Sequence, residues 1–177
     1  WVLNLPTPGS GNGAALLGDV RNLRVNEWMP APASGDDWFE IYNPEPLPVS
    51  VSGCFLSDSI DNPTAYLPIA NLSFLGAGTN AWKMFIADAN QAAGADHAPF
   101  RMNRQEAVII SDPNGGFINS VTFNHPSPQT GISEGRLPDG AETTALFPNS
   151  DSPGAANFLP LADIFINEIL THTDPPE

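Results

Sequence analysis

The chain has 177 residues, which is enough for one domain of ordinary size with some flanking sequence. Six Lys and Arg stand against 20 Asp and Glu, a formal net charge of -14, so the attraction that drives binding to nucleic acid or anionic membranes is missing. No apolar run approaches the length that a membrane span needs, and 15 Gly with 19 Pro interrupt any long helix. We therefore expect a turn-rich, all-β domain with no nucleic-acid partner and no membrane insertion.

Short apolar or alternating runs between turn residues predict strands along the chain. The seven runs are 24–29, 38–42, 49–56, 65–67, 83–87, 107–111 and 117–123, with a possible eighth at 135–137. In the second run, strand alternation places Phe39 and Ile41 on one face, which we expect to be the core, and Glu40 on the other. Between the last two of the seven, Asp-Pro-Asn-Gly-Gly at 112–116 predicts a tight hairpin.

Two short sequence blocks occur twice in the same order. Asn26-Glu27 recurs as Asn167-Glu168, and Pro-Gly-Ser-Gly-Asn at 8–12 recurs as Pro-Gly-Ala-Ala-Asn at 153–157. Internal self-similarity is the signature of repeat architectures. We therefore interpret the chain as part of a tandem array. Residues 1–20 are the tail of a preceding repeat and a linker, 21–158 a complete domain, and 159–177 a linker and the first strand of a following repeat.

Five blocks within the complete domain follow one another in the order found in a known family. They are Val-Asn-Glu at 25–27, Asp-Trp-Phe-Glu-Ile-Tyr-Asn at 37–43, Val-Ser-Gly-Cys-Phe-Leu-Ser-Asp at 51–58, Gly-Arg-Leu-Pro-Asp-Gly at 135–140 and Pro-Gly-Ala-Ala-Asn at 153–157. Together they resemble the lamin tail domain, an immunoglobulin-like module. The chain departs from that family at Cys54, where an aromatic residue is usual, and in a long alanine-rich insertion at 77–99.

The resemblance, with the strand count, implies an immunoglobulin-like β-sandwich of seven to eight strands. In nuclear lamins the family is an interaction module, and bacterial copies resemble spacers or accessory modules of large secreted and surface proteins. Because no coiled-coil heptads accompany the repeats, the chain is similar to the bacterial extracellular type. We expect a non-catalytic structural or interaction module, extracellular or at the cell surface, whose partners are neighbouring repeats or copies of itself.

A carbohydrate- or surface-binding accessory module is the alternative function. It would use exposed aromatic residues, with Trp28 and Trp82 as the candidates and polysaccharide as the partner. An enzyme is not expected. Gly-Ile-Ser-Glu-Gly at 131–135 has the spacing of a hydrolase nucleophile around Ser133, but the prolines on both sides of it do not fit the required strand and helix.

Calcium is the one cofactor with a candidate site, at Asp58 and Asp61 in a loop rich in side-chain oxygens. The loop lacks the glycine and distal glutamate of an EF-hand, so turn formation by these side chains is the simpler reading. Cys54 is the single cysteine, so it has no disulfide partner in the chain, and its apolar surroundings predict a buried thiol.

The two ends of the chain contain candidate assembly strands, which carry Val2 and Leu3 at one end and Ile164, Ile166 and Ile169 at the other. If they belong to neighbouring repeats, each lacks its native partner strand in this chain. We expect them to dock on the central sandwich or to join molecules by strand addition, giving dimers or fibres.

Overall fold

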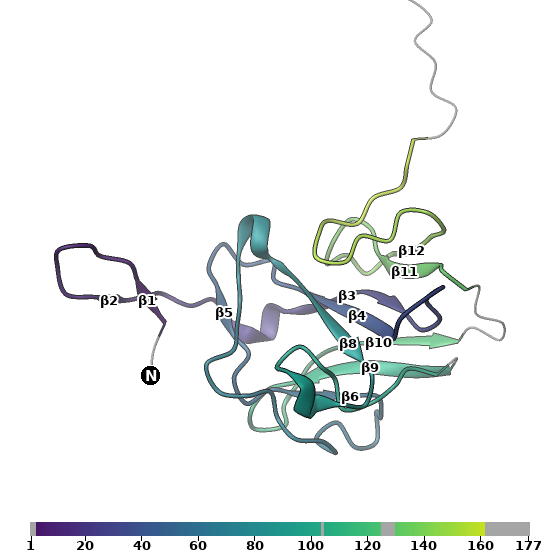
Figure 1. The fold of residues 1–177 in the computed structure, drawn as a ribbon, viewed down its shortest axis with the longest axis horizontal. Helices are drawn as coiled ribbons and strands as arrows, with labels where there is room; N and C mark the ends of the chain where they lie inside the picture. The colour runs from purple at the N-terminus through teal and green to yellow at the C-terminus, as the bar shows by residue number, and fades with distance from the viewer. Residues whose placement is uncertain (1–2, 104, 125–129, 162–177) are drawn as a thin grey trace, which may run out of the picture.

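The fold is all-β, as the sequence predicts. The computed structural model describes residues 3–103, 105–124 and 130–161 (Figure 1). Within them are twelve strands, more than the seven or eight expected, and three 3-10 helices of three residues each, η1 (Val20–Asn22), η2 (Gly78–Asn80) and η3 (Gln91–Ala93). None of these helices has the length or the apolar character to cross a membrane.

The strands form antiparallel sheets. Their bounds are β1 (Asn4–Leu5), β2 (Gly13–Ala14), β3 (Arg24–Met29), β4 (Asp37–Tyr42), β5 (Val49–Ser50), β6 (Phe55–Ser57), β7 (Phe74–Leu75), β8 (Trp82–Ala87), β9 (Gln105–Ser111), β10 (Phe117–Asn124), β11 (Ser133–Arg136) and β12 (Thr144–Phe147). A five-stranded sheet has the order β12-β11-β3-β4-β8, and a three-stranded sheet has the order β10-β9-β6. The pairs β5-β7 and β1-β2 complete the fold.

The core lies between the five-stranded and three-stranded sheets. Phe39 and Ile41 of β4 are 0% exposed, which confirms the face predicted from alternation. The Phe39 ring stacks on Phe85 of β8, with ring centroids 5.5 Å apart. Trp28 of β3 stacks on Phe123 of β10 at 6.4 Å and so joins the two sheets. Stacked aromatic pairs of this kind stabilise a core beyond the area that they bury.

The predicted strands agree with the structure where a run is long and alternating. Run 24–29 is β3, and 38–42, 83–87, 107–111 and 117–123 lie within β4, β8, β9 and β10. The prediction is wrong at 65–67, which is a loop, and at 49–56, which is interrupted between β5 and β6. The interruption is a turn in which Gly53 has a φ of 78°, a conformation that glycine adopts without strain. The predicted turn at 112–116 joins β9 to β10, as expected, and Gly116 O accepts a hydrogen bond from Asp112 N at 2.8 Å.

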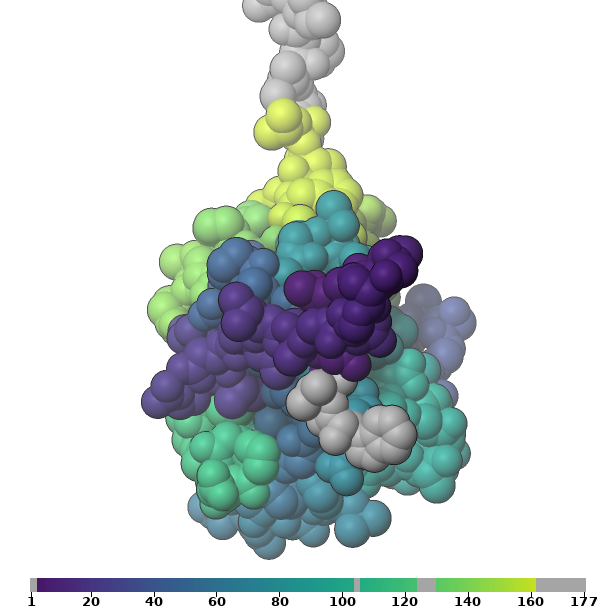
Figure 2. All heavy atoms as spheres, turned by 90° about the vertical axis from the view of Figure 1, so that its left-hand side faces the viewer, coloured from purple at the N-terminus to yellow at the C-terminus, as the bar shows by residue number. Residues whose placement is uncertain are grey.

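The N-terminal residues form a small hairpin that projects from the sandwich, at the opposite side from the C-terminal segment (Figure 1). In this hairpin β1 pairs with β2, and Ala15 N donates to Leu3 O at 2.7 Å. β1 therefore has a partner strand within its own hairpin, and docking on the sandwich or the joining of molecules by strand addition stays a prediction. Figure 2 looks onto the hairpin from its outer side, where it lies in front of the rest of the molecule.

Cys54 lies in the core with 0% exposure. Burial is the main cause that raises the pKa of its thiol to about 12, and the charge of Asp112 adds to the effect. Since the thiolate is the reactive form, the structure predicts an inert cysteine.

We expect native protein at pH 8 to resist a thiol reagent such as DTNB, whereas the protein unfolded in guanidinium should release one equivalent of product per chain. A free thiol of glutathione under the same buffer sets the unhindered rate. Native labelling at a rate close to that control would contradict the burial of Cys54.

Candidate functional site

A bulge in β3 brings two polar residues to the outer face of the five-stranded sheet. The pairing of β3 with β4 shifts between Val25 and Glu27, so that Asn26 is the extra residue. Val25 and Trp28 point into the core, while Asn26 and Glu27 bond to groups outside it. The shift places Glu27 directly opposite Glu40, where cross-strand side chains lie close together. We call Glu27 and Glu40 the carboxylate pair.

The segment Ser152–Asn157, which we call the closing segment, covers this outer face. It follows β12 and turns at Gly154, whose φ is 84°, with a hydrogen bond from Ala155 N to Ser152 O of 2.9 Å. Ser152 donates to Glu27 through both its backbone N and its hydroxyl, at 3.2 and 3.3 Å to Oε2. The first carboxylate of the pair is thus held by the start of the closing segment.

The second carboxylate is held by the turn itself. Gly154 N donates to Glu40 Oε2 at 2.6 Å, and Asn26 Nδ2 donates to Glu40 Oε1 at 3.2 Å. Asn26 Nδ2 also lies 2.9 Å from Asp139 Oδ1, and Asn26 Oδ1 accepts from Gly140 N at 2.9 Å. The bulge residue therefore links the carboxylate pair to the turn that follows β11.

Asn157 ends the closing segment and uses every polar group of its side chain. Its Nδ2 donates to Arg136 O at 2.9 Å and to Asn26 O at 3.3 Å, and its Oδ1 accepts from the Ser152 hydroxyl at 3.0 Å. Its backbone N donates to Asp139 Oδ1 at 3.0 Å. Asn157 is 7% exposed, so its side chain bonds to protein groups in place of water. These bonds fix the closing segment on the sheet.

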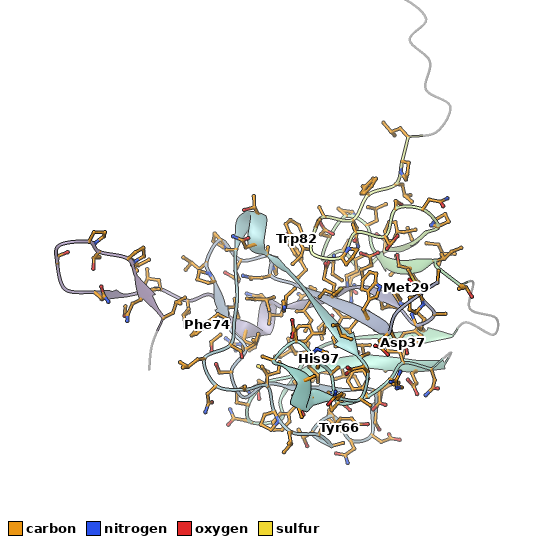
Figure 3. The ribbon with its side chains drawn as sticks, in the orientation of Figure 1. Met29, Asp37, Tyr66, Phe74, Trp82 and His97 are labelled. Atoms are coloured by element: carbon orange, nitrogen blue, oxygen red, sulfur yellow. The ribbon has the colours of Figure 1, made fainter. Side chains whose placement is uncertain are left out.

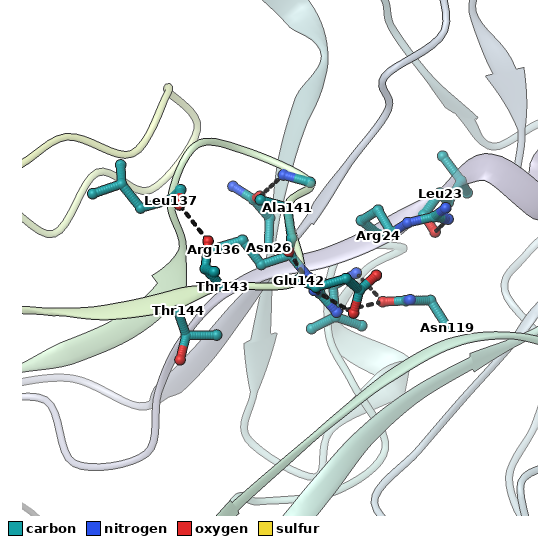
Figure 4. A network of polar contacts seen from close by, with 12 residues as sticks. Leu23, Arg24, Asn26, Asn119, Arg136, Leu137, Ala141, Glu142, Thr143 and Thr144 are labelled. Carbon is teal, nitrogen blue, oxygen red and sulfur yellow. Dashed lines mark hydrogen bonds and ion pairs between the residues drawn. The ribbon is translucent and has the colours of Figure 1, made fainter.

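Arg136 extends the network beneath the turn that follows β11 (Figure 4). It is 4% exposed, and its Nε donates to Val25 O at 2.7 Å while Nη1 donates to Ala141 O at 2.5 Å. Nη2 reaches Asn119 Oδ1 at 3.3 Å, and Glu142 lies 3.5 Å from Nη1. A buried guanidinium with this many acceptors ties β11 to β3 and to β10.

Burial changes the ionisation of the carboxylate pair. Desolvation is the largest cause that raises the pKa of Glu40 to about 8, against hydrogen bonds from Gly154 and Asn26 that lower it. Desolvation also raises the pKa of Glu27, against the hydrogen bonds from Ser133 and Ser152. Both carboxyl side chains are 0% exposed. Two enclosed, opposed carboxylates resist ionising together, and at neutral pH Glu40 is largely protonated.

The carboxylate pair is closed to solvent, and the one serine with hydrolase-like spacing is part of the same network. Ser133 is 0% exposed and donates from its hydroxyl to Glu27 Oε1 at 2.5 Å. It begins β11 and is followed by strand, whereas a nucleophile elbow needs a helix after the serine. The arrangement is a set of hydrogen bonds between strands, and Ser133 is unavailable to a substrate.

The two calcium candidates lie in the loop after β6. Asp58 accepts a hydrogen bond from the Tyr66 hydroxyl at 3.0 Å and lines an open groove of about 720 Å³ with Glu106. Asp61 is exposed. Across the described ranges, no three Asp, Glu, His or Cys side chains gather where a metal ion could be held. The loop therefore offers calcium at most two separate carboxylates in this conformation.

The two aromatic candidates differ in their exposure. Trp28 is 2% exposed within the core, so the prediction that it is a surface aromatic is wrong: its strand face is covered by the three-stranded sheet. Trp82, on the edge strand β8, is half-buried and stacks on Tyr42 with ring centroids 5.2 Å apart. Figure 3 shows Trp82 on a different part of the molecule from Tyr66 and Phe74, so these rings form no common face.

Of the candidate assembly residues, only Leu3 lies in the described chain, where it is half-buried beside the N-terminal hairpin. Val2, Ile164, Ile166 and Ile169 lie outside the described residues. Leu3 borders a groove of about 610 Å³ between the hairpin and β5-β7, together with Leu17, Leu72 and Phe74.

Sequence reasoning marked several residues of the network as repeated blocks but did not bring them together in space. Asn26, Glu27, Gly154 and Asn157 belong to the two blocks that recur, and the structure shows that these blocks contact each other, since Asn157 Nδ2 donates to Asn26 O. Asp139 lies in the block 135–140 that resembles the lamin tail domain, but the sequence did not indicate that it bonds to Asn26 and Asn157. No protein-family model, curated protein or solved structure matches this chain.

Proposed function

We propose that the chain is a non-catalytic structural or interaction module of a large tandem-repeat protein, extracellular or at the cell surface, and that it acts as a spacer or assembly unit. The immunoglobulin-like domain resembles the lamin tail domain in its sequence blocks. Its partners are neighbouring repeats or copies of itself.

One observation carries this proposal: the residues that the sequence repeats are the residues that close the sheet. Glu27 comes from one repeated block, and Gly154 and Asn157 come from the other. The second block bonds to the carboxylate pair and to the backbone beside it. A chain that carries additional copies of both blocks, at 8–12 and at 167–168, carries parts of further domains of the same construction.

The polar side chains of the network support a mechanical role over a chemical one. The carboxylate pair, Ser133 and Arg136 are buried and bonded to strands or to the closing segment. Catalysis or binding needs such groups at a cleft that a ligand can enter. Here they join β3, β4, β11 and the closing segment into one unit, which suits a module that spaces other domains.

A carbohydrate-binding module remains the second candidate, and the half-buried Trp82 stacked on Tyr42 favours it. Trp82 lies on the edge strand β8 and Tyr42 on its neighbour β4, and an aromatic ring at a sheet edge is a surface on which a sugar ring can stack. Without Trp28, the remaining aromatic surface is small.

Thermal unfolding with a panel of ligands distinguishes these functions. The protein is heated alone, with excess Ca²⁺, with chelator, and with a set of soluble polysaccharides. A ligand at 100 times its Kd stabilises a protein by about 2.7 kcal/mol, so binding is visible as a rise in Tm. For the structural module we expect the same Tm in every condition.

If a ligand does raise the Tm, control variants show which residues bind it. A rise with one glycan that Trp82→Ala abolishes would replace the proposal by the carbohydrate-binding module. A rise with Ca²⁺ that Asp58→Asn abolishes would show a metal site in the loop after β6.

A further inference from the structure

The N-terminal hairpin contains a turn with the same internal geometry as the closing segment. Thr7, Gly9 and Asn12 stand where the closing segment has Ser152, Gly154 and Asn157. Gly9 has a φ of 83° and Gly154 a φ of 84°. We call Thr7–Asn12 the N-terminal turn.

The hydrogen bonds inside the two turns also correspond. In the N-terminal turn Ser10 N donates to Thr7 O at 3.1 Å, as Ala155 N does to Ser152 O at 2.9 Å. The Thr7 hydroxyl lies 3.2 Å from Asn12 Oδ1 and 3.0 Å from Gly11 O, the second of which has the place that Glu27 takes for the Ser152 hydroxyl. In the closing segment the Ser152 hydroxyl lies 3.0 Å from Asn157 Oδ1. The N-terminal turn therefore holds the shape of a closing segment without a sheet beneath it.

The positions before the two turns differ in their burial. Two residues before each turn stand Leu5 and Ser150. Ser150 is 3% exposed, whereas Leu5 is 54% exposed. The chain beside the closing segment is therefore packed against the sandwich, while the corresponding position beside the N-terminal turn is open to solvent.

The outward bonds mark the greatest difference between the turns. In the closing segment the backbone N of Gly154 donates to Glu40, and Asn157 donates to Asp139 and to two carbonyls. Within residues 3–161 as described, the corresponding N–H groups of Gly9 and Asn12 donate to nothing, and Asn12 is exposed. The chain's own carboxylate pair is already covered by its own closing segment.

We propose that the N-terminal turn is a second closing segment and that it binds the carboxylate pair of another domain built like residues 21–158. The partner is a sheet face with two opposed glutamates, which accept the Gly9 N–H and the Thr7 hydroxyl. This inference rests on the proposed function and names the contact through which one repeat of the array is completed.

The first arm of the test grafts the N-terminal sequence into the full chain. Ser152→Thr, Ala155→Ser and Ala156→Gly together convert the closing segment into that of residues 7–12. The matched control carries Ser152→Val with the same two other changes, and so keeps the shape but loses the hydroxyl. We expect the Tm of the graft to stay within about 3 °C of the original and that of the control to fall by at least about 6 °C. A graft that falls as far as its control overturns the inference.

The second arm tests binding between molecules. Gly154→Pro removes the N–H that Glu40 accepts and loosens the chain's own closing segment. A synthetic peptide of residues 3–19 should then raise the Tm of this full-chain variant by several degrees at saturation, and the same peptide with Asn12→Ala should not. A peptide of residues 144–161 is the positive control.

The peptide results and the graft together decide whether the N-terminal turn is a closing segment. If 144–161 raises the Tm and 3–19 does not, the N-terminal turn is no closing segment and the inference is wrong. If neither peptide acts, the graft decides alone. These results are independent of the ligand panel. A rise in Tm with Ca²⁺ or a glycan would contradict the proposed spacer function, but it would not change whether the N-terminal turn can replace the closing segment.

Discussion

The free energy of unfolding should fall steadily as the pH is raised from about 5 to 9, and Glu40→Gln should remove most of that fall. The pKa of Glu40 is about 8 in the folded protein, well above its ordinary value of 4.5, chiefly because burial disfavours the charged form. Between these two values the folded state holds a proton that the unfolded state has released. Stability from this group is therefore complete below pH 4.5 and is lost as the pH rises through 8.

The expected size of the effect is on the order of 4 kcal/mol between pH 5 and 9, because each of the roughly three pH units between 5 and the folded pKa of about 8 corresponds to about 1.4 kcal/mol. Glu27, whose pKa is also raised by burial, contributes in the same direction. Asp19, whose pKa is lowered to about 2 by its hydrogen bond with Arg21, acts with the opposite sign and only below about pH 4. The pH range in which Asp19 changes the stability therefore does not overlap the range in which Glu40 does.

Urea unfolding at pH 5, 6, 7, 8 and 9 measures how steeply the free energy of unfolding falls with pH. The comparison is between the original chain, Glu40→Gln and Glu142→Gln, the last a control whose side chain is 88% exposed. The net charge of the chain affects all three proteins alike. A flat profile for the original chain, or an unchanged slope in Glu40→Gln, would show that the pair ionises freely in the folded state.

A methyl group at Gly135 should destabilise the domain by roughly 3 kcal/mol, an overpacking effect that includes the loss of bonds made by Asn157. A Cβ there would lie 2.7 Å from Asn26 O and from Asn157 Nδ2, and 3.0 Å from Glu27 Cα. Two of these are backbone atoms of the neighbouring strand. The methyl group must push β11 from β3 or expel the side chain that ends the closing segment.

Gly13→Ala is the matched control, because a Cβ at Gly13 has nothing within 4 Å, and we expect a change within about 0.5 kcal/mol. A double-mutant cycle then identifies the cause. In an Asn157→Ala background, Gly135→Ala should cost less than in the original chain, since one of the atoms it displaces has gone. Additive effects would show that Asn157 has no part in the loss.

The core could be predicted from the sequence because its signal is local. Phe39 and Ile41 alternate with polar neighbours in a single strand, and the Asn-Gly turn between β9 and β10 carries its own conformational preference. The failures at 65–67 and within 49–56 arise where apolar residues are set in a turn, as at Gly53, and local propensity gives way to tertiary context.

The closing segment could not be predicted in the same way. Alternation places Glu40 on the outer face, and nothing near it in sequence indicates that residues 152–157 will cover that face. The bulge at Asn26 is likewise a property of the register between two strands, which a single strand does not encode. The available signal was the joint repetition of two blocks, which predicted that they belong together without saying that they touch.

The position of the closing segment after the last strand has a consequence for synthesis of the chain. A ribosome makes residues 24–42 long before it makes residues 152–157, so the opposed glutamates of β3 and β4 exist for most of translation without the amide groups that cover them. In water, away from these amide groups, both carboxylates ionise at neutral pH and repel each other across the strands. The outer face of β3 and β4 is therefore completed only after residues 152–157 have been made.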